Sequence, residues 1–347
     1  MAADSALLWL GMQICGELSV VEEQSNRGAS KRRDHPRGYV CPRTTVTPRL
    51  DGRMDEAIWG HAPWTEEFVD IEGELRPNPR YRTRVRMLWD DDCLYIGAEM
   101  EEPHVWGTLT DHDCVIYNDN DFEVFLDPNG ACQHYVELEL NALNTTWDLM
   151  LTRPYRVGGR AISGWEFHGL RTAVSIDGTL NDPSDIDRGW KTEIAIPWSS
   201  LRDVTDRDLP PKSGDQWRIN FSRVEWQHDV IDGAYRRVPG TPEDNWVWEP
   251  TGVIDMHRPE RWGVLQFSDH MTDLPSLRPL EEWDERLTLI DLLEAQRAYR
   301  LEHGRFASAL TDLGFEHPSL SLEATSAQFR ATLGSWTIDH EWRLERI

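Results

Sequence analysis

The sequence has few basic residues and no long apolar run. Its 347 residues include 36 lysines and arginines against 61 aspartates and glutamates, which gives a formal charge of −25 at pH 7. Phosphate backbones and anionic lipids are bound by clustered lysine and arginine, so this balance argues against a nucleic-acid partner. The longest apolar stretch, residues 6–14, is shorter than the roughly 18 residues that a membrane span needs, so none is expected.

Cysteine pairs and the common catalytic motifs are missing as well. The five cysteines form no CxxC pair, so they indicate neither a zinc site nor a disulfide framework. The sequence also lacks HExxH, GxSxG, Walker A and Rossmann glycine patterns. These absences exclude the usual zinc protease, serine hydrolase, NTPase and dinucleotide-dependent enzymes.

Residues 22–38 are almost entirely polar and contain Lys31-Arg32-Arg33. This composition predicts a disordered leader over residues 1–38. Residues 6–14 are as apolar as the core of a signal peptide, but Asp4 stands where such a peptide carries positive charge. No export signal is therefore clear, and the localisation stays open on these residues alone.

Short runs of alternating apolar and polar residues fill the chain from 39 to 268, separated by Asp, Asn, Gly and Pro. This pattern predicts an all-β fold, an antiparallel β-sandwich. Within Phe122–Leu126, alternate side chains must point to opposite faces, so Glu123 and Phe125 share one face. The clearest predicted strands are Arg84–Trp89, Cys93–Met100, Asp121–Asp127, Tyr135–Leu140, Lys191–Pro197, Gln216–Val224 and Trp262–Phe267, the first two forming a hairpin.

The character of the sequence changes after the sandwich region. Residues 269–281 contain prolines and are predicted to be a linker, and 282–347 to be a small α+β appendage with a helix over 282–303 and a β-rich end. Residues 295–314 resemble the segment after the first helix of type IV pilins and pseudopilins. Because the membrane-spanning helix of those proteins is absent, an appendage is expected rather than a filament subunit.

Several ordered motifs resemble family 9 carbohydrate-binding modules. The resemblance covers nearly all of 40–268 and none of the tail, and it implies a jelly-roll type sandwich. The motifs that carry it are Leu50–Trp59, Val85–Asp90 with Leu94–Ile96, Asn120–Asp127, Trp190–Trp198, Arg218–Arg223 and Arg261–Phe267.

This resemblance implies non-catalytic binding of a polysaccharide end, with a sugar held between two aromatic rings. Such rings stack on the apolar faces of a pyranose, while carboxylates and amides bind its hydroxyl groups. The resemblance also favours an extracytoplasmic, periplasmic or secreted location. Matched residue by residue, Tyr117 takes the place of the first stacking Trp and Glu123 that of the strand acid. Glu139 stands where the family has an Arg, and the second stacking Trp falls near Met256.

The seventeen tryptophans divide by their surroundings. Those in or beside the fold motifs are expected in the core: Trp59, Trp89, Trp198, Trp217 and Trp262. Others lie in loop-like sequence and are candidates for sugar contact, and Trp246 and Trp248 alternate with Val247, so an extended chain would point both the same way. The predicted sugar site is Tyr117, Glu123, Asn144, Trp147, Trp246, Trp248 and Arg258.

Three functions stay open, namely sugar binding, glycoside hydrolysis and a protein-interaction scaffold, and the neighbouring acidic residues bear on the second. Glu123, Glu137 and Glu139 occupy alternate strand positions, so they form either a solvated sheet face or, with Asp121, the carboxylate pair of a glycoside hydrolase. The third alternative is a protein-interaction scaffold of the same fold. No catalytic residue is assigned, and the oligomeric state stays open.

A run of possible oxygen ligands precedes the acidic strand. Asp111-His112-Asp113 is followed by Tyr117, Asp119 and Asp121, but the spacing does not match an EF-hand loop. The family resemblance allows structural calcium here, and a solvated acidic loop is the other interpretation. No cofactor is expected to be required.

Overall fold

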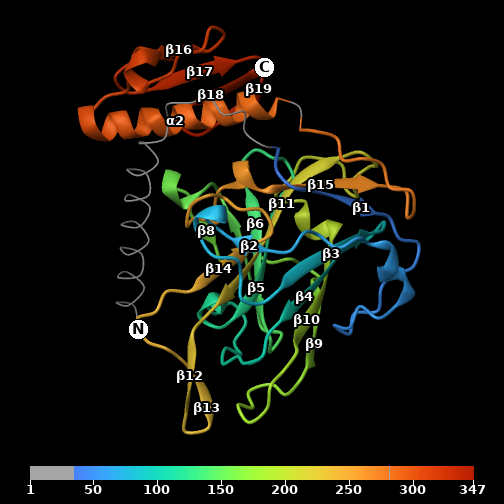
Figure 1. Cartoon of the computed structure of the whole chain (residues 1–347). Helices are drawn as coiled ribbons and strands as arrows, with labels where there is room; N and C mark the ends of the chain where they lie inside the picture. Colours follow the sequence, from blue (N-terminus) through green and yellow to red (C-terminus); the bar gives the residue numbers. More distant parts are fainter. Residues whose placement is uncertain (1–34, 281) are drawn as a thin grey trace. The chain divides into compact units, whose positions relative to one another are not determined.

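A computed structural model describes residues 35–280 and 282–347. Most of the predicted leader, residues 1–34, therefore lies outside the described residues. The chain divides into a sandwich unit, Pro36–Leu277, and a second unit that includes Arg278–Ile347 (Figure 1). The boundary falls inside the predicted linker, 269–281. The backbone N–H of Arg37 donates to Glu249 at 3.0 Å, so the last residues of the predicted leader belong to the sandwich unit.

The larger sheet of the sandwich unit has nine strands in the order β1-β15-β11-β5-β6-β7-β8, with β14 pairing with β11 and β2. Its pairings are antiparallel apart from the parallel pair of β1 and β15. The strands are β1 (Gly38–Pro42), β2 (Val69–Asp70), β5 (Asp121–Asp127), β6 (Tyr135–Asn141), β7 (Thr146–Leu151), β8 (Ala161–Ile162), β11 (Gln216–Glu225), β14 (Asp244–Val247) and β15 (Gly263–Ser268).

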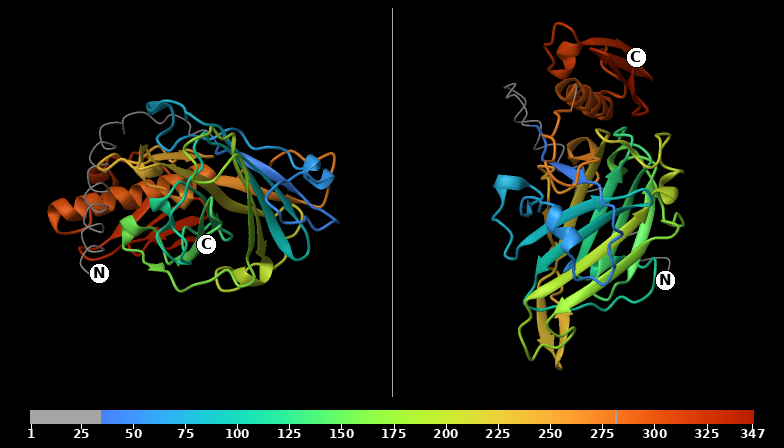
Figure 2. Two further views of the ribbon diagram at one scale, coloured as in Figure 1. Left: turned by 90° about the horizontal axis from the view of Figure 1, so that it is seen from below. Right: turned by 90° about the vertical axis from the view of Figure 1, so that its right-hand side faces the viewer.

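The smaller sheet has four strands in the order β3-β4-β10-β9, and a separate ribbon pairs β12 with β13. The predicted all-β sandwich and the predicted hairpin are confirmed, as Figure 2 lets the reader follow from two further sides. These strands are β3 (Thr83–Trp89), β4 (Cys93–Glu101), β9 (Arg171–Asp177), β10 (Gly189–Pro197), β12 (His228–Ile231) and β13 (Ala234–Arg237). Short 3-10 helices in the unit are Ala57–His61, Gly73–Leu75, Ile116–Asn118, Tyr155–Val157, Trp198–Leu201 and Pro259–Arg261.

The core lies between the apolar faces of the two sheets. On β5 the inward side chains are Phe122, Val124 and Leu126, all at most 2% exposed. The five tryptophans predicted to be structural, 59, 89, 198, 217 and 262, are all at most 3% exposed. Burying one large apolar side chain contributes roughly 1.5–3 kcal/mol, so these rings are major contributors to stability.

The Leu50–Trp59 motif is tied to β10 through a single carboxylate. Glu193 accepts hydrogen bonds from the backbone N–H groups of Asp51 (3.0 Å) and Gly52 (2.7 Å) and from the indole of Trp59 (2.8 Å). Gly52 has φ of +79°, and a Cβ there would lie 2.5 Å from the backbone nitrogen of Ser175. The turn therefore requires glycine, which explains the Asp-Gly pair in the sequence.

A buried ion-pair cluster joins the two sheets. Arg223 on β11 contacts carboxylates of Glu102 and Glu225, each at 2.8 Å, and all three side chains are at most 2% exposed. Its guanidinium also donates to the backbone oxygen of Glu101 at 2.9 Å, at the end of β4. Because a buried charge without a partner is costly, this cluster fixes how the sheets pack.

The second unit contains the predicted helix, α2 (Trp283–His303), and a four-stranded sheet. The amide of Gln296 bonds both the backbone N–H and the oxygen of Ala307, which ties the segment after the helix to its buried face. No helix among the described residues is long and apolar enough to span a bilayer. The strands are β16 (Ser321–Ala324), β17 (Phe329–Leu333), β18 (Trp336–Asp339) and β19 (Leu344–Arg346), and a 3-10 helix covers Leu310–Leu313.

Candidate functional site

Four carboxylates gather on the outer face of the nine-stranded sheet, the face opposite the core. Glu123 of β5 stands directly across from Glu139 of β6, and Phe125 from Glu137. Oxygen atoms of Asp121, Glu123 and Glu139 lie within 4.8 Å of one another. The sequence alternation therefore placed these side chains on the correct face, but they are at most 6% exposed rather than solvated.

This carboxylate cluster has no cationic partner in the part of the chain that the structure describes. Asp121 accepts a bond from the backbone N–H of Val224 at 3.2 Å with Oδ1, while its buried Oδ2 has no hydrogen-bond partner. Glu139 accepts from the backbone N–H of Tyr117 at 3.0 Å. Buried carboxylate oxygens without full partners can bind either hydroxyl groups or a cation.

Burial shifts the protonation of the cluster toward neutral pH. It raises the pKa of Glu123 to about 7, against a lowering effect of the nearby Ser222 hydroxyl. Burial, with repulsion from Glu123, raises the pKa of Asp121, Glu137 and Glu139 well above their ordinary values. The cluster therefore retains protons near pH 7 and can both donate and accept hydrogen bonds.

Three half-buried aromatic rings border the cluster. The rings of Tyr117 and Trp147 lie 6.4 Å apart between centroids with an interplanar angle of 34°. Trp147 on β7 is directly opposite Glu139 in the sheet, and the Tyr117 backbone bonds the same carboxylate. Burial, and then the charges of Glu137 and Glu139, raise the pKa of Tyr155, which places this third ring beside the same acids.

A layer of buried rings supports this face from one side. His257 packs edge-on against Tyr155 at 4.6 Å between centroids, and its Nδ1 lies 3.1 Å from the hydroxyl of Tyr135. Burial lowers the pKa of His257 to about 4, so the imidazole is neutral at pH 7. Trp262, fully buried, donates its indole N–H to Met256, the residue near the expected second stacking position, at 2.8 Å.

The structure brings together three of the predicted site residues, Tyr117, Glu123 and Trp147. It contradicts the predicted stacking surface of Trp246 and Trp248, which are 2% and 0% exposed in the main core. Trp246 lies in strand β14 (Asp244–Val247), and Trp248 follows the strand directly. Both rings point to the same face, as expected, but that face is the core side and not the surface.

Both rings have structural partners. The guanidinium of Arg223 lies 5.2 Å from the centroid of the Trp246 ring, and the Trp248 indole donates to Glu66 at 3.0 Å. Because the two rings are 2% and 0% exposed, neither offers a face to a ligand.

Two further predicted residues lie apart from the carboxylate cluster. Asn144, exposed and with φ of +62°, stands in the turn between β6 and β7 and directs its amide to the oxygen of Thr172 at 3.5 Å. Arg258 is 2% exposed and pairs with Asp255 at 3.6 Å, so it presents little surface to a ligand. A turn role for Asn is the common reason for positive φ in a non-glycine residue.

Some residues around the site were not predicted. Tyr155 follows Arg153-Pro154, where the sequence gives only a lone aromatic in a loop. Glu243 lies close enough to raise the pKa of both Tyr117 and Glu123, but it precedes a strand that was interpreted as a loop. Only three-dimensional pairing of distant strands reveals these neighbours.

The acidic run 111–121 does not converge on one point. Asp119 accepts bonds from the backbone N–H groups of Thr108 (2.7 Å) and Leu109 (2.9 Å), while Asp121 joins the carboxylate cluster. His112 and Asp113 turn toward a different group of residues. Calcium bound by this run as a single loop remains a prediction that this arrangement does not favour.

Comparison with known proteins gives matches in the sandwich region. Residues 50–210 match the family model described as carbohydrate family 9 binding domain-like. Endo-1,4-beta-xylanase A of Thermotoga maritima is 26% identical over 156 residues, 45% of this chain and 12% of the xylanase. The same enzyme of Thermotoga neapolitana is 25% identical over the same shares. The chain thus corresponds to a small part of these relatives.

One solved structure supports a similar fold, and others resemble the chain more distantly. A proposed carbohydrate-binding protein of Bacteroides uniformis superposes with a TM-score of 0.50 at 16% identity, over 67% of this chain and 100% of that one. A family 9 carbohydrate-binding module of Caldicellulosiruptor kristjanssonii, in complex with cellotriose, gives a TM-score of 0.44 at 16% identity over 70% and 100%. The pilin-like resemblance of the tail receives no support. Residues 50–210 are therefore similar to carbohydrate-binding domains of the family 9 type.

Proposed function

We propose that the sandwich unit binds a neutral carbohydrate on the outer face of its larger sheet, and that binding involves no catalysis. The observation that carries this proposal is the position of the Tyr117 and Trp147 rings, 6.4 Å apart, next to the Glu123 and Glu139 carboxylates. Half-buried aromatic rings beside buried polar groups are the combination that a sugar site needs.

Each part of the site has a chemical role in this proposal. The rings supply apolar faces for the C–H groups of a pyranose, and the carboxylates accept hydrogen bonds from its hydroxyls. Raised pKa values let one carboxyl in the cluster keep its proton and donate to a ring or hydroxyl oxygen. Because the groups are buried, each such bond is stronger than at a water-exposed surface.

The charge of the cluster sets the ligand class. Glu139 stands where the family resemblance places an arginine, and no arginine or lysine pairs with the cluster among the described residues. An anionic sugar such as a uronate would add a like charge to a buried acidic site. Neutral glycans are therefore the proposed ligands. Cello- and xylo-oligosaccharides are suitable first probes, because a similar module was solved in complex with cellotriose and the similar curated proteins are xylanases.

Calorimetric titration with cellotriose and xylotriose, after a glycan array, tests the proposal. Tyr117→Ala and Trp147→Ala should each weaken binding by about ten- to hundredfold, the range for loss of roughly 1–3 kcal/mol from one stacked ring. Trp64→Ala is the matched control, because Trp64 is also half-buried but stacks on Arg84 (4.1 Å to the ring centroid) in the smaller sheet. Equal loss in Trp64→Ala, or no loss in the site variants, would refute the site.

Glycoside hydrolysis is the second candidate, favoured by one observation. Glu123, with its pKa raised to about 7, could act as a general acid beside the other carboxyl groups of the cluster. This alternative predicts release of reducing sugar from xylan or cellulose, lost in Glu123→Gln. Binding without release supports the first proposal, and neither binding nor release from any arrayed glycan favours a scaffold role.

A further inference from the structure

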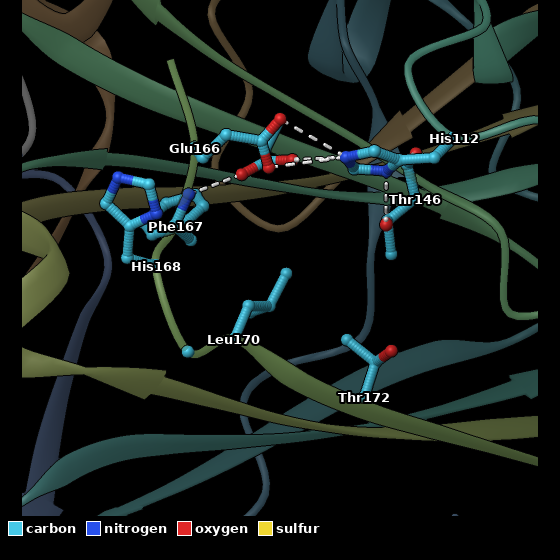
Figure 3. A pocket seen from close by; sticks show the side chains of 9 residues that line it. His112, Thr146, Glu166, Phe167, His168, Leu170 and Thr172 are labelled. Atoms are coloured by element: carbon cyan, nitrogen blue, oxygen red, sulfur yellow. Dashed lines mark hydrogen bonds and ion pairs between the residues drawn. The ribbon is translucent and has the colours of Figure 1, made fainter. Parts of the chain in front are cut away.

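A second group of ligand-type side chains lies on the same unit, separate from the carboxylate cluster. His112, Asp113, Asp148 and Glu166 each offer one atom, and these atoms lie within 4.8 Å of one another. They come from three segments: the loop before β5, strand β7, and the loop between β8 and β9. His112, Asp148 and Glu166 line an open cavity of about 290 Å³, and Figure 3 shows the His112 imidazole pointing toward Glu166.

The imidazole of His112 is oriented by its other nitrogen. Nδ1 lies 2.9 Å from the backbone oxygen of Thr146, an acceptor, so Nδ1 carries the hydrogen. In the neutral ring, the lone pair is then on Nε2, which faces the three carboxylates. A histidine that donates from one ring nitrogen to a backbone carbonyl and offers the other is the usual arrangement of a metal ligand.

Asp148 supplies an independent sign that something binds there. Its Oδ2 accepts from the backbone N–H of Phe167 at 2.5 Å, but its Oδ1 is buried and has no hydrogen-bond partner. The residue is 1% exposed, and Oδ1 is directed at the cluster, 3.9 Å from Nε2 of His112. A buried carboxylate oxygen left without a partner is costly, and a cation would satisfy it.

The spacing of the ligand atoms matches a small ion. Nε2 of His112 lies 3.3 Å from Glu166 Oε2, 3.4 Å from Asp113 Oδ1 and 3.9 Å from Asp148 Oδ1. Around a tetrahedral zinc ion, with bonds of about 2.0 Å, ligand atoms are roughly 3.3 Å apart. All four ligand atoms lie within 4.8 Å of one another, so a shift of the exposed side chains would bring them to one centre.

We propose that His112, Asp113, Asp148 and Glu166 bind one divalent transition-metal ion of the zinc type. An imidazole nitrogen with three carboxylate oxygens suits zinc and its neighbours, whereas calcium takes oxygen ligands alone and about six to eight of them. This proposal is independent of sugar binding. The ion joins β7, which carries Trp147, to the loops on either side of it, so its role is structural.

Zinc titration of the metal-stripped full chain, made without a histidine tag, tests this site. Calorimetry should show one zinc ion per chain, and Co²⁺ should give the visible absorption of a tetrahedral nitrogen and oxygen site. His112→Ala and Glu166→Gln, whose side chains are 50% and 38% exposed and so are not needed for folding, should each lower zinc affinity at least about tenfold. Zinc should also raise the melting temperature of the parent chain and not that of His112→Ala.

His168→Ala is the matched control, because His168 lines the same cavity but is outside the four-residue group. It should bind zinc as the parent does. The proposal is overturned if zinc does not bind at millimolar concentration, if calcium binds in preference to zinc, or if His112→Ala and Glu166→Gln retain parental affinity.

Discussion

Two groups of buried acidic side chains in the sandwich unit differ in the presence of a cation. Glu102 and Glu225 enclose Arg223, whereas Asp121, Glu123 and Glu139 have no arginine or lysine partner among the described residues. Both groups are at most 6% exposed. The first joins the two sheets, and the second opens toward half-buried rings.

This difference separates a structural role from a binding role. A buried carboxylate with a guanidinium partner contributes to packing, and the same group without one destabilises the fold unless a ligand or proton joins it. Compensation is partial even in the first group, because burial still raises the pKa of Glu225 to about 8 against the lowering effect of Arg223. Ligand binding would explain why the fold keeps a carboxylate cluster that has no cationic partner and therefore lowers its stability.

The largest expected effect comes from removing the cation. Arg223→Met leaves two buried carboxylates without a partner and should lower the free energy of unfolding by about 3–5 kcal/mol. Urea denaturation followed by tryptophan fluorescence measures this. Arg84→Met is the control, because Arg84 pairs with Glu99 in a partly exposed site (2.8 Å, 27% and 20% exposed) and should cost at most about 1 kcal/mol. Equal losses in the two variants would contradict a special role for Arg223.

The pH dependence of stability should reveal the uncompensated cluster. Glu123 binds its proton with a pKa of about 7 when folded and about 4.5 when unfolded, so between these values the native state holds more protons. Its stabilising contribution is complete below pH 4.5 and is lost as the pH rises through 7. Raised pKa values of Asp121, Glu137 and Glu139 act in the same direction.

We therefore expect the sandwich unit to be less stable at pH 8 than at pH 5.5. Glu139→Gln removes one like charge from the pair with Glu123 and should raise the unfolding free energy at pH 8 by on the order of 1–3 kcal/mol. Glu102→Gln should do the opposite at the same pH, because it weakens a pair with Arg223. Melting curves recorded between pH 5.5 and pH 8 measure both changes. If the two variants change the unfolding free energy at pH 8 in the same direction, the two groups of acids do not differ in this way.

Local alternation was enough to predict seven strands of the sandwich unit and the face of each side chain on β5 and β6, but not the remaining strands, such as β7 and β9. The family resemblance, not the alternation, suggested Tyr117 and Glu123, and Trp147 was taken from loop-like sequence although the structure places it on β7. The local pattern failed at Trp246 and Trp248, because Pro, Asn and Glu around them indicated a loop, while their strand is fixed by pairing with β11, distant in sequence. Tyr155 was missed for the related reason that a loop residue's neighbours depend on tertiary contacts.

The His112 group also depends on contacts between segments that are distant in the sequence. The sequence indicated oxygen ligands near residues 111–113, but their partners, Asp148 and Glu166, lie more than thirty residues further along the chain. Carboxylates are so common in this sequence that no spacing rule could select these two. Folding alone brings the four side chains together.

The smallest expected effect concerns the shape of the stacking ring rather than its charge environment. Trp147→Phe keeps an aromatic face opposite Glu139 but reduces its area and removes the indole N–H, which has no hydrogen-bond partner among the described residues. Because stacking depends on the ring face, the variant should lose only about two- to fivefold in affinity for an oligosaccharide, against ten- to hundredfold for Trp147→Ala. Calorimetry with both variants measures the ratio. If Trp147→Phe binds as poorly as Trp147→Ala, the indole N–H itself contacts the sugar, and the ligand lies along the edge of this ring rather than over its face.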